Sequence, residues 1–258
     1  MKQSTFYYLL RRGVIGGGAA IIKNGLVMFN KFTTAGISHP AQGSAEFNGS
    51  SDFIDIPDTN LPSGTSARTI SAWIYPNAND NGRIISYGTG TTNAAFDIIT
   101  QASTNVLAVI GYANNRFSTT AISLNEWAFI SVTLSSGTLK MYVNGSEIYS
   151  ANSVGLDTTL SGSARIGKSV WDVNDWNGNL ANVAIWNRAL SSDEINSVMW
   201  KSYKGLTGAE SNGLQAWYSL DDITSPAASL ANMEQLATDK DLSIENKAAI
   251  TAAINSLS

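Results

Sequence analysis

The segment "EWAFISVTLSSGTLKMYVNGSEIYS" (126–150) limits the fold more than any other part of the chain. Apolar and polar side chains alternate in residues 129–134 and again in residues 139–143, which is the periodicity of a β-strand with one buried face. Two tight-turn signals, Ser136-Gly137 and Asn144-Gly145, separate these runs, and the second is typical of a type I′ hairpin. The segment therefore predicts consecutive antiparallel strands.

Further strand patterns occur at intervals of roughly ten residues, with turn residues between them, which is typical of a sandwich or barrel. "RTISAWIYP" (68–76) sets Ile70, Ala72 and Ile74 against polar or aromatic neighbours, and "LANVAIWN" (180–187) places Ala181, Val183 and Ile185 on one side. Apolar residues make up 43% of the chain and charged residues only 14%, whereas about a quarter of a typical protein is charged. The surface must therefore be rich in Ser, Thr, Asn and Gly, which suits a β-sandwich.

One helix is predicted within this series of strands, in "RALSSDEINSVMWKSYKG" (188–205). Ser191 and Glu194 have the spacing of a capping box at its start, and Gly205 stands where a C-cap is expected. Its apolar residues form one stripe, so we expect the helix to lie on the surface of the sandwich.

Composition divides the chain into three regions. Residues 1–23 have no regular period and predict an extended N-terminal arm, residues 24–222 form the series of strands, and residues 223–258 predict a short helical C-terminal segment. Short helices are marginal alone in water, so we expect the last segment to pack on the sandwich or on another chain.

Charge and cysteine content exclude several classes of function. The net charge of −4 leaves no basic footprint for nucleic acid or for an anionic membrane surface. The chain has no cysteine, so disulfides, zinc-thiolate sites and cysteine nucleophiles are excluded. The longest apolar stretch, residues 13–22, is too short to span a bilayer.

Several motifs, in order, resemble a known family. They are "GSAEFNGSSDFIDIPD", "TISAWIYP", "NEWAFISVTLSSGTLKMYVNG", "ARIGKS" and "WNGNLANVAIWNRALSSDEI", which together cover about residues 43–200. This order is similar to the laminin-G-like, concanavalin A-like jelly-roll family. The resemblance implies an all-β fold of two curved antiparallel sheets stacked face to face. The family includes lectins, carbohydrate-binding modules, adhesion domains, glycosidases and virion proteins, so the fold alone does not decide the function.

The stretch "SDFIDIPD" (51–58) raises the question of catalysis, because glycosidases use paired carboxylates. Asp52, Asp55 and Asp58 are spaced by three, so on an extended strand they alternate between its two faces. The only histidine, His39, precedes a proline in a turn, where it is expected to be solvated. We therefore interpret the stretch as a strand and predict that the protein is not an enzyme.

A ligand site is predicted in the loop "GKSVWDVNDWNGN" (167–179), which combines aromatic rings, amides and carboxylates. The candidate glycan contacts are Trp171, Asn174, Trp176 and Asn177, and the candidate calcium ligands are Asp172 and Asp175. In the alternative interpretation, Trp176 packs under the helix and the two aspartates cap turns. "YANNRF" (112–117) is a second polar and aromatic group, for which a hairpin turn is the simpler interpretation.

The arrangement of the three regions and the resemblance to the family favour two functions; a glycosidase is the third, which measured hydrolysis of a glucan would revive. The first is a non-enzymatic structural protein of a virion, a capsid or tail decoration of a bacteriophage, that contacts other virion proteins through residues 1–40 and 225–258. The alternative is a carbohydrate-binding or host-adhesion module for a surface glycan, extracellular or on a bacterial surface, with Ca²⁺ as an open question. A homo-oligomer formed through the C-terminal helices is also left open.

Overall fold

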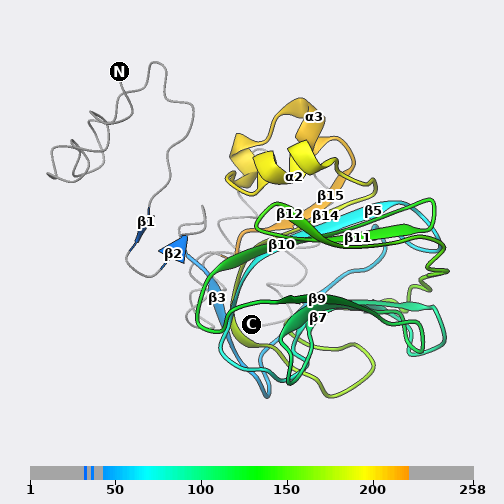
Figure 1. Ribbon diagram of the computed structural model, residues 1–258. Helices are drawn as coiled ribbons and strands as arrows, with labels where there is room; N and C mark the ends of the chain where they lie inside the picture. Colours follow the sequence, from blue (N-terminus) through cyan, green and yellow to red (C-terminus); the bar gives the residue numbers. More distant parts are fainter. Residues whose placement is uncertain (1–31, 34–35, 38–42, 221–258) are drawn as a thin grey trace, which may run out of the picture.

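In a computed structural model, which describes residues 32–33, 36–37 and 43–220, two antiparallel sheets stack face to face (Figure 1). This confirms the predicted all-β sandwich. Two short strands, β1 (Phe32–Thr33) and β2 (Gly36–Ile37), pair only with each other. The predicted arm (1–23) and the predicted C-terminal segment (223–258) cannot be compared with the structure, because both lie outside the described residues.

The larger sheet has seven strands, in the order β12-β11-β10-β5-β14-β15, with β3 also paired to β14. These strands are β3 (Ala45–Asn48), β5 (Arg68–Pro76), β10 (Ala128–Ser135), β11 (Thr138–Val143), β12 (Ser146–Ala151), β14 (Asn177–Trp186) and β15 (Leu214–Tyr218). The β10-β11-β12 meander is the predicted run of strands, and positive φ angles at Asn144 and Gly145 confirm its predicted hairpin turn.

The smaller sheet has six strands, in the order β4-β13-β6-β7-β8-β9. They are β4 (Ile54–Ile56), β6 (Arg83–Gly88), β7 (Ala95–Thr100), β8 (Val106–Ile110), β9 (Arg116–Ala121) and β13 (Ala164–Ile166).

The main hydrophobic core lies between the two sheets. Ile70, Ala72 and Ile74 of β5 all belong to it, whereas Trp73 points to the outer face, as the alternation predicted. The predicted face of Ala181 is wrong, because Val183 and Ile185 lie in the core and Ala181 lies outside it. The cause is an irregularity in the pairing of β14 with β5 between residues 181 and 184, which reverses the faces of the strand.

Helix α2 (Ser192–Val198) covers the outer face of the larger sheet (Figure 1). Its buried side chains pack against the aromatic side chains of that face. The predicted capping box of Ser191 and Glu194 is present at its start. The predicted C-cap at Gly205 is wrong, since the helix ends at Val198 and Gly205 closes a separate turn, η1 (Tyr203–Gly205).

A second capping box, formed by Thr207 and Glu210, starts the short helix α3 (Gly208–Ser211). No helix in the described part of the chain is long and apolar enough to cross a membrane.

Candidate functional site

The loop of residues 167–176, between β13 and β14, lies over the outer face of the smaller sheet. The hydroxyl of Ser86, on β6, holds it there by accepting the backbone N–H of Val170 at 3.0 Å. The same hydroxyl donates to Asp97 Oδ1, on β7, at 2.7 Å. A backbone bond from the N–H of Trp176 to the carbonyl of Gly167, at 2.7 Å, closes the loop. The loop is therefore anchored directly to β6, through Ser86 to β7, and at its own base.

Arg83, on β6, is the central residue of this region. Its Nε donates to Asp97 Oδ2 at 3.2 Å, and its Nη2 donates to Asp172 Oδ2 at 2.7 Å. Its guanidinium carbon lies 5.3 Å from the ring centroid of Trp171, which is within cation–π range. The buried arginine thus fixes one strand carboxylate, one loop carboxylate and one loop aromatic ring in a single arrangement.

The electrostatics of this network centre on Asp97, whose side chain has no solvent exposure. Burial raises the pKa of Asp97 to about 7, against the opposing effects of Arg83 and of the hydrogen bond from Ser86. The carboxylate is therefore held at this position by the fold at a cost in stability.

A hollow of about 240 Å³ opens beside Arg83 and Trp171. Apolar side chains of β7, β8 and β9 line it together with amides from the surrounding loops and strands. The lining residues are Asn81, Arg83, Ile99, Gln101, Ile110, Asn115, Phe117, Trp171 and Asn174. Apolar surface with a few placed polar groups is the general composition of a small-molecule site.

Two of the segments singled out in the sequence meet at this hollow. Asn115 and Phe117, from "YANNRF", line it together with Trp171 of the 167–179 loop. The rings of Tyr112 and Trp171 make an edge-to-face contact with centroids 5.3 Å apart. The segment expected to be only a turn therefore contributes to the same site.

The structure separates the four predicted glycan contacts. Trp171 and Asn174 line the hollow. Trp176 is 1% exposed and packs in the core between the sheets, so in this conformation its ring offers no face to a ligand. It does not pack under the helix, as the alternative interpretation expected, because the helix covers a different cluster. Asn177 begins β14 and pairs with Asn48 of β3.

The two predicted calcium ligands are engaged by cations of the chain. Asp172 pairs with Arg83 and also caps a turn by accepting the backbone N–H of Asn174 at 3.0 Å. Asp175 pairs with Lys168 at 2.9 Å. Among residues 43–220, no group of three or more His, Cys, Asp or Glu side chains is placed to hold a metal ion. A cation at Asp172 would have to compete with Arg83.

The acidic stretch at 51–58 enters β4, and its carboxylates have separate structural partners. Asp52 accepts the backbone N–H of Asn48, and Asp55 pairs with Arg165 at 2.9 Å. Asp58 is buried and accepts two backbone N–H groups of the loop before β13. These contacts favour the interpretation of the stretch as structural.

Sequence reasoning did not identify Arg83, Asn81 or Gln101 as site residues. Nothing in the local pattern "NDNGRI" shows that Arg83 lies against a loop almost ninety positions later. A lone arginine at the start of a strand carries no signal of this kind without the pairing of the strands.

Comparison with known proteins places this geometry in a family. Residues 48–196, more than half of the chain, match the family model described as the concanavalin A-like lectin/glucanases superfamily. No curated protein matches the chain in sequence.

Solved structures share the fold at low sequence identity. Domain 4 of an extracellular arabinanase from Geobacillus stearothermophilus, solved in complex with arabinotriose, is 21% identical with a TM-score of 0.51, covering 60% of this chain and 76% of that one. A putative carbohydrate binding protein from Bacteroides ovatus is 17% identical with a TM-score of 0.54, covering 73% of this chain and 54% of that one. The sialidase module CBM40 of Ruminococcus gnavus, bound to sialyllactose, is 12% identical with a TM-score of 0.51. The match covers 61% of this chain and 97% of that one.

Proposed function

Because the chain belongs to the concanavalin A-like lectin/glucanase superfamily, we propose that it is a non-catalytic carbohydrate-binding protein that holds a surface glycan in the hollow beside Trp171. One observation carries this proposal. Two segments far apart in the sequence bring aromatic rings and amides together on the outer face of the smaller sheet.

The lining suits a sugar for chemical reasons. Trp171 and Phe117 present apolar rings that can pack on the C–H face of a sugar, and the amides of Asn81, Gln101 and Asn115 can donate to or accept from its hydroxyls. Arg83 holds Trp171 in place before a ligand arrives, so little side-chain entropy is lost on binding.

The fold relatives point in the same direction. The arabinanase domain was solved with arabinotriose and the sialidase module with sialyllactose, and the Bacteroides protein is named for carbohydrate binding. These relatives support a glycan as the class of ligand, and they support a place of action outside the cell or on a surface.

The experiment is a glycan array probed with the full chain and with two variants. Trp171→Ala removes the aromatic platform, and Trp200→Ala is the matched control, because Trp200 is also a partly buried tryptophan but lies against Trp73 on the opposite sheet. We expect Trp171→Ala to lose the signal of at least one glycan that the wild type binds. We expect Trp200→Ala to keep the wild-type pattern. A folded wild-type chain that binds no glycan contradicts the proposed function.

A calcium arm of the same array tests the predicted metal ligands Asp172 and Asp175. Since each carboxylate already pairs with a cationic side chain, we expect the same signal with calcium and with chelator. A signal that chelator removes would contradict this expectation.

The virion role predicted from the sequence remains a prediction. It depends on residues 1–40 and 225–258, nearly all of which lie outside the described residues. Its test is deletion of residues 1–23, which is expected to leave the sandwich folded but to prevent incorporation into particles. A glycan site on the sandwich is compatible with that role.

A further inference from the structure

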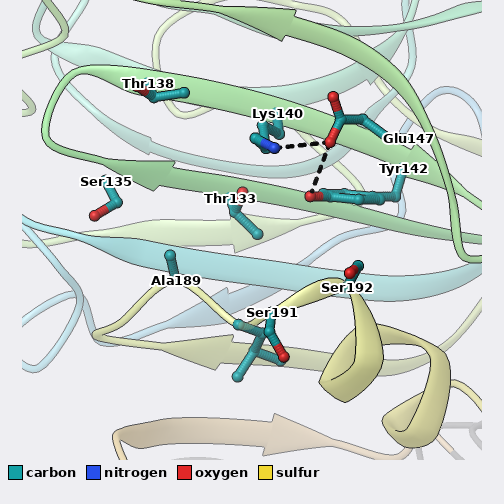
Figure 2. A pocket seen from close by; sticks show the side chains of 10 residues that line it. Thr133, Ser135, Thr138, Lys140, Tyr142, Glu147, Ala189, Ser191 and Ser192 are labelled. Atoms are coloured by element: carbon teal, nitrogen blue, oxygen red, sulfur yellow. Dashed lines mark hydrogen bonds and ion pairs between the residues drawn. The ribbon is translucent and has the colours of Figure 1, made fainter.

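A second hollow, of about 330 Å³, lies on the outer face of the larger sheet, beside the start of α2 (Figure 2). Side chains of β10, β11 and β12 form one side, and the loop that enters the helix forms the other. The lining residues are Thr133, Ser135, Thr138, Lys140, Tyr142, Glu147, Ala189, Leu190, Ser191 and Ser192. None of them belongs to the hollow beside Trp171.

Hydroxyl groups dominate the chemistry of this second hollow. Thr133, Ser135 and Thr138 lie on one side and Ser191 and Ser192 on the other (Figure 2). Within the described part of the chain, no hydrogen bond is formed by the side chains of Ser135 and Ser192, so both hydroxyls are available to donate and to accept.

The charges in the hollow compensate each other. Lys140 Nζ lies 2.8 Å from Glu147 Oε2, and the Tyr142 hydroxyl lies 3.4 Å from the same oxygen. Each side chain of the ion pair is 40% exposed, so each keeps donors or acceptors free for a ligand. A surface with one cation, one anion and several hydroxyls favours a neutral polyhydroxylated ligand over an anion or an apolar group.

The walls of the hollow are rigid. Cross-strand pairing of Thr133 with Lys140 and of Ser135 with Thr138 fixes the strand side. On the loop side, Thr69 Oγ1 donates to the carbonyl of Arg188 at 2.7 Å and accepts the backbone N–H of Leu190 at 2.8 Å. A site with both walls fixed before binding loses little conformational entropy when a ligand enters.

We propose that this second hollow is an independent binding site for a neutral sugar. The two hollows lie on the outer faces of opposite sheets, so they face away from each other and one short oligosaccharide cannot occupy both. One chain therefore bridges two separate glycan strands or surfaces, a consequence that rests on the proposed function of the Trp171 hollow.

The test uses the full chain, the double variant Lys140→Met/Glu147→Gln, the variant Trp171→Ala and the combination of both. The lysine–glutamate pair is exposed, so removing it is expected to leave the melting temperature close to that of the wild type. Thr120→Val, at an exposed position of β9 outside both hollows, is the matched control. Each chain is applied to immobilised neutral and sialylated oligosaccharides, among them arabinotriose and sialyllactose.

We expect Trp171→Ala to keep a signal confined to neutral glycans, and we expect the added double substitution to weaken that signal roughly ten-fold or more. A blank array for Trp171→Ala, beside a positive wild type, overturns the second site and leaves the proposed function standing. A blank array for the wild type overturns both. Ser192→Tyr, added to Trp171→Ala, fills the second hollow without removing a charge and must reproduce the loss of the neutral-glycan signal. If that signal persists, the loss caused by the double substitution is not due to binding in the second hollow, and the proposal is overturned.

Discussion

The substitution Asp97→Asn should change how the stability of the protein depends on pH. Asp97 is fully buried beneath the 167–176 loop, between Arg83 and Ser86. Burial raises its pKa from 3.8 to about 7, although Arg83 opposes this change. The folded state therefore holds a proton on this carboxyl at pH values where the unfolded chain has already released it.

The size and sign of the effect follow from the two pKa values. Between pH 3.8 and about 7 the unfolded state binds fewer protons than the folded state, so the free energy of unfolding falls as pH rises. A difference of about three pKa units corresponds to about 4 kcal/mol over the whole window. Roughly 2 to 3 kcal/mol of this falls between about pH 5 and about pH 8. Asparagine does not titrate, so the variant lacks this contribution.

Urea denaturation at pH 5 and pH 8 measures the difference directly. The wild type should lose roughly 2 to 3 kcal/mol more than Asp97→Asn between the two pH values. Asp55→Asn is the matched control for replacing a carboxylate with an amide, because Asp55 forms an exposed ion pair with Arg165, away from Arg83 and Ser86. Equal pH dependence in the wild type and in Asp97→Asn would refute the reasoning.

Three further substitutions test the scaffold. Gly178→Ala should lower the free energy of unfolding by about 2 to 4 kcal/mol in thermal unfolding, because φ is +140° and a Cβ would lie 2.0 Å from the carbonyl oxygen of Tyr75. Gly208→Ala is the control: the space around Gly208 is open, so this substitution should leave the free energy of unfolding unchanged. Thr69→Val should cost about 1 to 3 kcal/mol in urea denaturation, because it leaves two backbone groups before α2 without their partner; no change would show that water replaces it. Trp176→Phe should lower the free energy of unfolding by about 1 to 3 kcal/mol and leave glycan binding on the array intact. Loss of glycan binding in a folded Trp176→Phe variant would contradict the placement of Trp176 in the core.

Much of the fold could be predicted from local sequence patterns. The alternation in residues 68–76, the Asn144-Gly145 turn and the capping box at Ser191 each follow from short-range chemistry, and the structure confirms them. The face of Ala181 was predicted wrongly because a break in strand pairing depends on the neighbouring strand, which a period of two does not reveal. The capping box at Thr207 has the T-x-x-E signal in the sequence and could have been found.

The site was predictable only in part, for a physical reason. The loop 167–179 has a distinctive composition, but composition does not tell which of its tryptophans is buried. Trp171 and Trp176 are five positions apart, and only the strand that follows draws Trp176 into the core. The partners Arg83 and Phe117 reach the hollow through sheet pairing over long sequence separations, which no local pattern shows.

The most direct measurement is a titration of the ¹⁵N-labelled full chain with a glycan that binds on the array, followed through the indole N–H signals of its seven tryptophans. Trp171→Phe assigns the signal of Trp171 by its disappearance. Since Trp171 lines the hollow while Trp73, Trp176 and Trp186 are fully buried elsewhere, we expect the Trp171 signal to move most on binding to the hollow and those three to stay. The titration uses a glycan whose array signal is lost in Trp171→Ala. If this glycan binds saturably but leaves the Trp171 signal in place, the assignment of the site is contradicted.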